Sequence, residues 1–252
     1  MQRMSLSGRI ALITGGGRGI GAACARRLAG AGARVIVCGR DEAKLVEVAA
    51  ETGGHAIRVD LSDRTAVDGV MREIGRVDVL VNNAGIAESR KLADADDEHW
   101  DRIMEINATA AFRLCRALVP AMVQTKWGRV VNVASNAGLT GYAYTSAYCA
   151  SKHAMVGFTR ALAVDVAAHG VTVNAVCPGW VDTEMADRAV SNIAAKTGRG
   201  EDTARGALEQ MSPQRRMITA DEVAHVVAML CDDGGRGIHG QAIVIDGGAL
   251  KR

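Results

Sequence analysis

Aromatic residues and prolines are scarce in this sequence of 252 residues. Phe, Trp and Tyr together make up 3% of the chain, and only three prolines occur. Because no Pro-rich or Ser-rich tract marks a linker, we expect one domain spanning residues 1–252. Hydrophobic residues make up 48% and charged residues 23%, which excludes a disordered, collagen-like or coiled-coil chain. All three tyrosines fall within residues 142–148, so this short stretch stands out.

A strong charge of either sign is also missing. The 30 basic and 28 acidic residues leave a formal net charge of +2. This balance excludes the basic surface typical of nucleic-acid binding and gives no reason to expect a membrane partner. No long apolar run lies near the first residue, so we predict no signal peptide. The longest uncharged stretch, residues 130–151, holds several Asn, Ser and Thr side chains and is too polar for a membrane span. We expect it to line a dry pocket.

Paired cysteines and clustered metal ligands are absent from the sequence. The six cysteines form no CxxC pair, and none of the six histidines stands at a metal-binding spacing. We therefore predict reduced, mostly buried thiols, a cytoplasmic location and no metal site.

Short apolar runs alternate with amphipathic stretches along most of the chain. The strand-like runs, several of them rich in Val and Ile, are residues 10–14, 34–38, 56–59, 77–82, 129–134, 172–177 and 242–245. The helical stretches between them are residues 20–29, 41–50, 64–74, 97–124, 147–168 and 221–230. This alternation predicts an α/β fold of the Rossmann-like kind, a doubly wound parallel sheet of seven strands with helices on both faces.

The alternation stops in residues 182–217, where Arg, Glu, Ala and Gly follow one another without a strand. An insertion of this length between a strand and a helix suggests a binding segment. We expect a mobile substrate-binding lid here, within the single domain.

A glycine-rich turn follows the first predicted strand and leads into a helix. Its sequence from Thr14 to Gly21 is TGGGRGIG, which has one residue more than the usual GxGxxG spacing. Glycines let backbone N–H groups at a helix N-terminus approach a pyrophosphate, where the helix dipole favours negative charge. The turn predicts a dinucleotide contact through its glycines and their neighbours: Gly15, Gly17, Arg18, Gly19, Ile20 and Gly21. A purely structural turn is the alternative.

The residue after the second strand bears on which dinucleotide binds. NAD enzymes normally place an acidic residue there, on the adenosine ribose, whereas this chain continues with Gly39 and Arg40. Arg40 and Arg18 could together hold a 2′-phosphate through bidentate contacts. We therefore expect NADP(H) to be preferred, with NAD(H) possible. The neighbouring Asp41 and the abundance of arginine, 24 of the 30 basic residues, keep open the alternative of two solvated surface arginines.

Tyr148 and Lys152 lie four residues apart, so on a helix they share a face. Reducing a carbonyl requires a proton, but a free tyrosine with a pKa of about 10 is poorly matched to neutral pH. A nearby ammonium would lower that pKa, and Lys152 is placed to provide it. Ser135 ends a predicted strand, where ligands collect in open α/β sheets, and could hold the substrate oxygen.

Together, these motifs resemble the short-chain dehydrogenase/reductase family in order and spacing over essentially the whole chain. The resemblance adds Asn107 as a fourth catalytic residue that orders a water between Lys152 and solvent. It also implies that further positions contact the cofactor: Asn83, Ala84 and Gly85 beneath it, Asp60 and Leu61 beside the adenine, and Pro178, Gly179 and Thr183 along the nicotinamide half, with Tyr148 and Lys152.

The resemblance implies reversible hydride transfer between a nicotinamide and a carbonyl or secondary alcohol, with Tyr148 as general acid or base. It is strongest to 3-oxoacyl reductases acting on carrier-protein or coenzyme A thioesters. Dehydrogenases of small or cyclic alcohols, sugars or steroids share these motifs, and a dinucleotide-sensing regulator is the non-enzyme alternative. Arginines and Lys196 in the predicted lid could meet an anionic handle, although a solvated surface explains them equally well. The family resemblance further implies a homotetramer.

Overall fold

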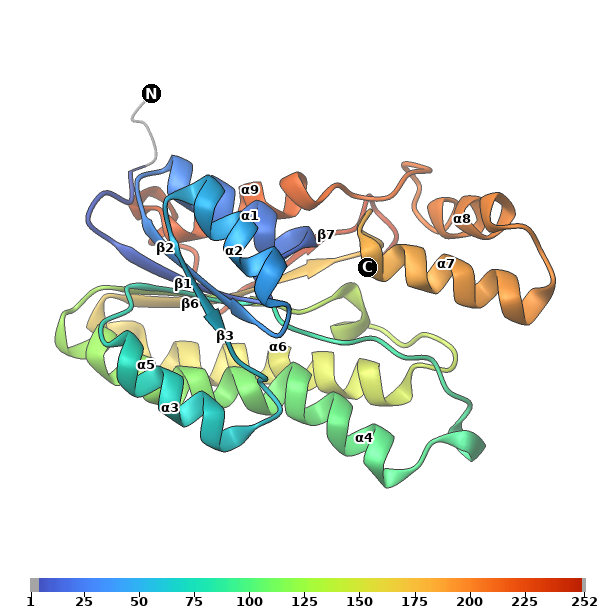
Figure 1. Cartoon of the computed structure of the whole chain (residues 1–252), viewed down its shortest axis with the longest axis horizontal. Coiled ribbons are helices and arrows are strands. Elements are labelled where there is room, and N and C mark those ends of the chain that lie inside the picture. The colour runs from blue at the N-terminus through green and yellow to red at the C-terminus, as the bar shows by residue number, and fades with distance from the viewer. Residues whose placement is uncertain (1–4, 251–252) are drawn as a thin grey trace.

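Seven parallel strands form the centre of the molecule in a computed structural model that describes residues 5–250 (Figure 1). The strands, in chain order, are β1 (Ile10–Thr14), β2 (Arg34–Gly39), β3 (His55–Arg58), β4 (Val79–Asn82), β5 (Gly128–Val133), β6 (Val171–Pro178) and β7 (Ala242–Ile245). Their order in the sheet is β3-β2-β1-β4-β5-β6-β7, and every neighbouring pair is parallel. From β1 the chain adds β2 and β3 on one side and then returns to place β4 on the other side of β1. Open sheets of this kind bind ligands at the point where the strand order reverses in this way.

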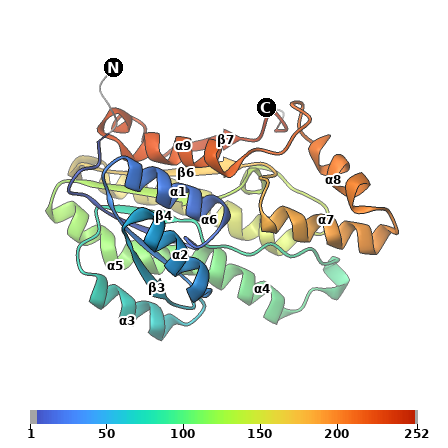
Figure 2. The ribbon, with the colours of Figure 1, turned by 45° about the horizontal axis from the view of Figure 1, so that its top comes forward.

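Helices cover both faces of the sheet, as the sequence predicts (Figures 1 and 2). One face carries α1 (Gly19–Gly30), α2 (Glu42–Thr52) and α9 (Ala220–Cys231). The other carries α3 (Arg64–Ile74), α5 (Ala110–Gln124) and α6 (Ser146–Val166), with α4 (Asp97–Met104) beside them. The predicted doubly wound sheet of seven strands is confirmed.

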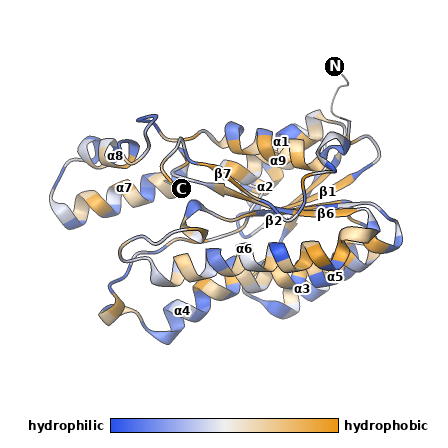
Figure 3. Cartoon of the chain, turned by 180° about the vertical axis from the view of Figure 1, so that it is seen from behind, coloured by the Kyte–Doolittle hydropathy of each residue, from blue (hydrophilic) through white to orange (hydrophobic). Residues whose placement is uncertain are grey.

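Alternate residues of the central strands enter two different hydrophobic clusters. In β2, Val35 and Val37 pack in the cluster with α1, whereas Ile36 and Cys38 pack in the cluster with α5. A strand buried on both faces needs apolar residues at every position, and this explains the nearly continuous apolar runs in the sequence. Figure 3 shows these strands in hydrophobic colours between the two helical layers.

The predicted helix over residues 97–124 is interrupted in the structure. α4 ends at Met104, a π-helical turn covers Glu105–Thr109, and α5 then continues to Gln124. The extra residue of a π-turn turns its side chains relative to a regular helix. This stretch is also long and apolar enough to span a membrane by composition. However, Leu114 and Met122 of α5 are buried in the cluster beneath the sheet, as expected of a core helix.

The predicted strand over residues 77–82 begins two residues late, at Val79. Asp78 explains the difference, because its carboxylate accepts a hydrogen bond from the backbone N–H of Ile10 at 2.9 Å. The same carboxylate accepts hydrogen bonds from the guanidinium of Arg76. Asp78 therefore ties the entry of β4 to the first residue of β1.

Residues 182–217 form two helices, α7 (Glu184–Thr197) and α8 (Glu201–Glu209), which extend beyond the strand ends (Figures 1 and 2). They share a small hydrophobic cluster of their own, made by Ala186, Val190, Ala204, Leu208 and Met217. The segment therefore has its own packing contacts, and its motion stays a prediction.

Gly21 packs α1 against the glycine-rich turn, and its substitution tests that close approach. A Cβ at this position would collide with the backbone oxygen of Gly15. We predict that Gly21→Ala lowers the free energy of unfolding by about 1–3 kcal/mol, a typical cost of overpacking. The matched control is Gly30→Ala in the same helix, where a Cβ meets nothing within 4 Å. It should be neutral or slightly stabilising, since alanine favours helix. Urea unfolding measures both, and equal effects would contradict the packing argument.

Candidate active site

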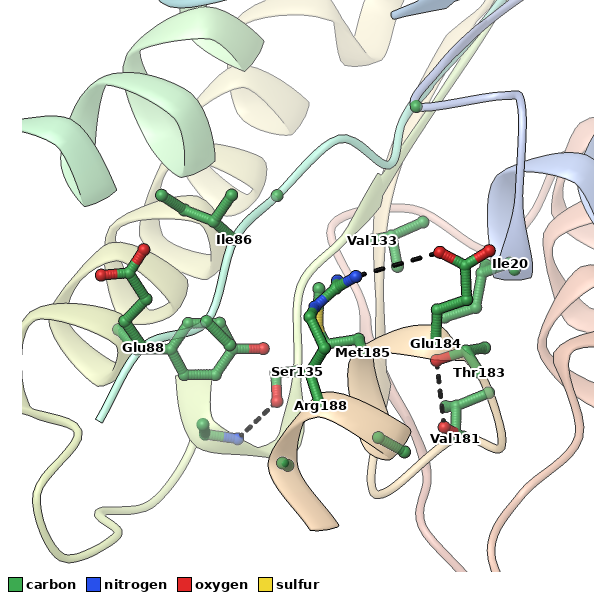
Figure 4. A pocket seen from close by; sticks show the side chains of 18 of the residues that line it. Ile20, Ile86, Glu88, Val133, Ser135, Val181, Thr183, Glu184, Met185 and Arg188 are labelled. Atoms are coloured by element: carbon green, nitrogen blue, oxygen red, sulfur yellow. Dashed lines mark hydrogen bonds and ion pairs between the residues drawn. The ribbon is translucent and has the colours of Figure 1, made fainter. Parts of the chain in front are cut away.

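A cavity of about 880 Å³ opens at the carboxyl ends of the strands (Figure 4). The glycine-rich turn and the end of β2 line one part of it. The residues after β4, the end of β5 and the first turns of α6 line another, and α7 covers a third side. Each predicted cofactor residue lines this cavity except Gly21, which is buried beneath the turn. Of the predicted catalytic residues, Ser135, Tyr148 and Lys152 line it, and Asn107 lies behind its wall.

Asn83 and Thr14 fix the shape of the glycine-rich turn. The side-chain amide of Asn83 donates to the backbone oxygens of Thr14 at 2.9 Å and Gly15 at 3.2 Å. The hydroxyl of Thr14 in turn accepts from the backbone N–H groups of Asn83 and Ala84, both at 2.9 Å. These bonds join β1 to the loop after β4, at the reversal of the strand order.

The turn leaves the start of α1 suited to a phosphate. Arg18 is the N-cap residue of α1, and its side chain makes no capping hydrogen bond. The first backbone N–H groups of the helix are therefore not capped by the N-cap side chain. Gly19 has a positive φ of 51°, a conformation that glycine adopts without strain. The residues present therefore fit a dinucleotide pyrophosphate at this helix end.

Lys152 carries a buried charge beside the end of β5. Only 4% of the residue is exposed, and its ammonium donates to the backbone oxygen of Val133 at 2.9 Å. Burial disfavours the charged form and lowers the pKa of Lys152 from 10.5 to about 8. The ammonium lies 5.8 Å from the centroid of the Tyr148 ring. The predicted neighbourhood of these two side chains is therefore present.

The expected lowering of the Tyr148 pKa is wrong for this structure. Burial raises the pKa of Tyr148, while a hydrogen bond with Ser135 opposes the rise. Lys152 donates a hydrogen bond to the backbone oxygen of Val133 and is not among the groups that shift the pKa of Tyr148 in this structure. With its pKa raised above the usual value, the phenol of Tyr148 carries its proton at neutral pH.

Asn107 lies in the π-turn and has no exposed surface. Its side-chain oxygen accepts from the backbone N–H of Ile86 at 2.8 Å, and its amide nitrogen donates to the oxygen of Ile86 at 2.9 Å. The same nitrogen donates to the hydroxyl of Ser151 at 3.0 Å. Asn107 thus joins the loop after β4 to α6, one residue before Lys152. An amide oxygen has a second lone pair, and the predicted water contact stays a prediction.

Sequence reasoning missed several residues of the cavity wall. Ile86 and Glu88 follow β4, and Glu184 and Met185 begin α7 (Figure 4). Lys44 of α2 also lines the cavity. No motif marked them, although Ile86 directly follows the predicted Gly85 and Glu184 directly follows the predicted Thr183. The other two tyrosines of residues 142–148, Tyr142 and Tyr144, also line the cavity.

The structure sorts the basic residues of the predicted lid. Arg205 donates to Asp182 at 2.9 Å and to Asp187 at 2.5 Å, and Arg216 donates to Glu222. Arg188 and Lys196 instead line the cavity. These two remain candidates for an anionic handle, although Arg188 also lies 3.9 Å from the carboxylate of Glu184. Arg205 and Arg216 are hydrogen-bonded to carboxylates.

Comparison with known proteins identifies the family. A family model described as short chain dehydrogenase matches residues 9–194. The chain belongs to the short-chain dehydrogenase family. This short-chain dehydrogenase is 39% identical to D-beta-hydroxybutyrate dehydrogenase of Cupriavidus necator, over 96% of this chain and 98% of the relative. It is 36% identical to the 3-oxoacyl-[acyl-carrier-protein] reductase of Escherichia coli, over 97% and 98%.

A solved structure agrees with these relatives. The short-chain dehydrogenase matches a variant of actinorhodin polyketide ketoreductase crystallised with NADPH, with a TM-score of 0.90 and 36% identity over 96% of this chain and 97% of the other. The chain is therefore an oxidoreductase that acts on alcohol or carbonyl groups and uses a nicotinamide dinucleotide. Among residues 5–250, no group of three His, Cys, Asp or Glu side chains is arranged to hold a metal ion.

The buried Lys152 makes the stability of the protein depend on pH. Between about pH 8 and 10.5 this lysine is more protonated in the unfolded chain than in the folded one, so its own contribution to wild-type stability becomes more favourable as the pH rises through this window. Lys152→Met removes this group. We predict that the stability of the variant relative to wild type falls by about 3 kcal/mol between pH 7 and pH 10.5.

Urea unfolding at several pH values measures this difference directly. The matched control is Lys196→Met, which removes an exposed lysine near the end of α7. Its stability relative to wild type should not fall comparably over this pH range. A stability difference for Lys152→Met that is constant over the window would contradict a buried charge at this position.

Proposed function

We propose that this short-chain dehydrogenase reduces the 3-keto group of an acyl thioester with NADP(H). The observation that carries the proposal is the joining of Ser135, Tyr148 and Lys152 to the glycine-rich turn by one cavity. Relatives named as 3-oxoacyl and ketoacyl reductases, 36–37% identical over nearly the whole chain, support the substrate class.

Three side chains divide the work on the substrate oxygen. Ser135 is 8% exposed and lies beside Tyr148, so its hydroxyl can hold the carbonyl oxygen next to the phenol. The raised pKa of Tyr148 keeps its proton in place until negative charge develops on that oxygen, and the phenol then donates it. A nicotinamide dinucleotide held by the glycine-rich turn would supply the hydride in this direction. In the reverse direction Tyr148 takes the proton, and the positive charge of Lys152 favours the phenolate.

The end of β2 supports the preference for NADP(H). Arg40 lines the cavity directly after the strand, and Arg18 faces the same space from the glycine-rich turn. Asp41 is the acidic residue that could reverse the preference by binding a ribose. Its carboxylate instead accepts from the backbone N–H of Lys44 and caps α2. The two guanidinium groups of Arg18 and Arg40, and an Asp41 carboxylate that is hydrogen-bonded to the helix, favour binding of a 2′-phosphate.

The size of the cavity and its lid favour a substrate with an extended anionic handle. The cavity of about 880 Å³ reaches from Tyr148 to the cations Arg188 and Lys196 on α7. A carrier-protein or coenzyme A thioester would bring its phosphate to this side. The second candidate is dehydrogenation of a small secondary alcohol, favoured by the 39% identity to D-beta-hydroxybutyrate dehydrogenase. A dinucleotide-sensing regulator is disfavoured, because both Tyr148 and Lys152 are present.

The outer faces of the long helices support the proposed homotetramer. Phe112 on α5 is 45% exposed and packs edge to face on Phe158 of α6, while Val164 of α6 is 79% exposed. Apolar side chains outside the core favour association with another copy. We keep the cytoplasmic location as a proposal. The cysteines of the described residues are free and mostly buried, which agrees with a reducing compartment.

Consumption of NADPH with acetoacetyl-CoA tests the proposed function. We predict turnover, with a kcat/KM for NADPH above that for NADH, and slower turnover of free acetoacetate and simple ketones. Tyr148→Phe should lower kcat by at least about 100-fold because the proton donor is lost, while NADPH binding stays within about twofold of wild type. Turnover limited to acetoacetate or to simple alcohols would favour the second candidate, and full activity in Tyr148→Phe would refute the proposed acid.

A further inference from the structure

Glu184, the first residue of α7, gathers cations from three separate elements. One oxygen of its carboxylate accepts from Arg18 of the glycine-rich turn at 3.0 Å. The other accepts from the ammonium of Lys44 on α2. Arg188, one turn along α7, lies 3.9 Å from the first oxygen, and Figure 4 shows its guanidinium directed at Glu184. Lys44 and Arg18 hold the pKa of Glu184 below its usual value, with the hydrogen bond from Lys44 as the largest cause.

Arg18 is one of the two cations to which the proposed function assigns the 2′-phosphate, and Lys44 lies beside the same glycine-rich turn. Arg18 belongs to the turn itself, and a Cβ on Gly17 of that turn would lie 3.2 Å from the Cβ of Lys44. Arg40, at the end of β2, lines the same part of the cavity. The carboxylate of Glu184 thus occupies an anion position between cations that could bind the 2′-phosphate.

We propose that Glu184 is a residue that sets cofactor specificity, because its carboxylate competes with the 2′-phosphate for Arg18 and Lys44. Binding of NADP(H) exchanges one anion for the other and frees the start of α7 from the glycine-rich turn. The inference rests on the proposed NADP(H) preference. On this proposal Glu184 lowers the affinity for NADP(H). Binding of the 2′-phosphate is then coupled to the position of the lid, residues 182–217.

The exposure of the cluster makes this exchange feasible. The side chains of Arg18, Lys44 and Glu184 are 46%, 39% and 44% exposed, so their ion pairs are weak and screened by salt. A phosphate carries more negative charge than a carboxylate and offers three acceptor oxygens, so it can displace Glu184. The lid need not unfold, because Arg205 of α8 also bonds Asp187 of α7.

Direct binding of NADPH and NADH to Glu184→Gln tests the competition. The substitution keeps the size and helix preference of an exposed side chain and removes its charge. We predict that Kd for NADPH falls about three- to tenfold while Kd for NADH changes by less than about twofold. Asp187→Asn is the matched control, since it removes another lid carboxylate that pairs outside the cavity. It should leave both constants within about twofold of wild type.

The salt dependence supplies a second readout. In wild type the 2′-phosphate replaces the carboxylate of Glu184 on Arg18 and Lys44, so the number of ion pairs changes little. In Glu184→Gln these cations have no carboxylate of residue 184 to exchange, so the phosphate forms additional ion pairs. The NADPH Kd of the variant should therefore rise more steeply with salt than that of wild type. An equal or shallower slope would contradict the exchange.

The outcomes separate this inference from the function on which it rests. Weaker or unchanged NADPH binding in Glu184→Gln overturns the proposed competition. An equal gain in affinity for NADH would mean that Glu184 competes with the pyrophosphate, which both cofactors share, and would overturn its role in specificity. Both results leave the NADP(H) preference of wild type intact. Wild-type protein that binds NADH as tightly as NADPH overturns the preference itself, and the inference with it.

Discussion

The site depends on one buried positive charge, the ammonium of Lys152 held on the backbone oxygen of Val133. A buried ammonium requires a fixed acceptor, and the last residue of β5 provides it because its neighbours in a parallel sheet hold it rigidly. Asn107 and Ser151 brace the same region from the π-turn and from α6. The cost is a lowered pKa of Lys152, so this charge is kept at the expense of stability at neutral pH.

The two ends of the cavity use charge in opposite ways. At the chemical end, Lys152 is buried and a raised pKa keeps the proton on Tyr148, so protonation is set by a rigid environment. At the phosphate end, Arg18 and Glu184 are about half exposed and their pairing is weak. A reaction centre benefits from fixed charges because they need no rearrangement during the reaction. A binding end that must take up and release a cofactor benefits from charges that exchange partners readily.

The strands and the catalytic motif could be predicted from the sequence because each depends on local spacing. The apolar run of β2 reflects burial on both faces of the sheet, and the spacing of four positions from Tyr148 to Lys152 places both on one side of α6. The π-turn at Glu105–Thr109 could not be predicted, since one extra residue barely changes a helical pattern. The contact of Glu184 with Arg18 spans 166 residues and leaves no local signal. The raised pKa of Tyr148 follows from its burial, which the spacing of residues along the chain does not reveal.

The fate of a deuterium label tests the central claim, that this cavity transfers a hydride directly onto a carbonyl carbon while Tyr148 supplies the proton. Acetoacetyl-CoA would be reduced with NADPH carrying deuterium on one face of C4, then on the other, and the product examined by mass spectrometry and NMR. The account predicts that one of the two labelled cofactors delivers its deuterium entirely to C3 of the 3-hydroxyacyl product. Loss of the label to solvent, or equal transfer from both faces, would contradict it.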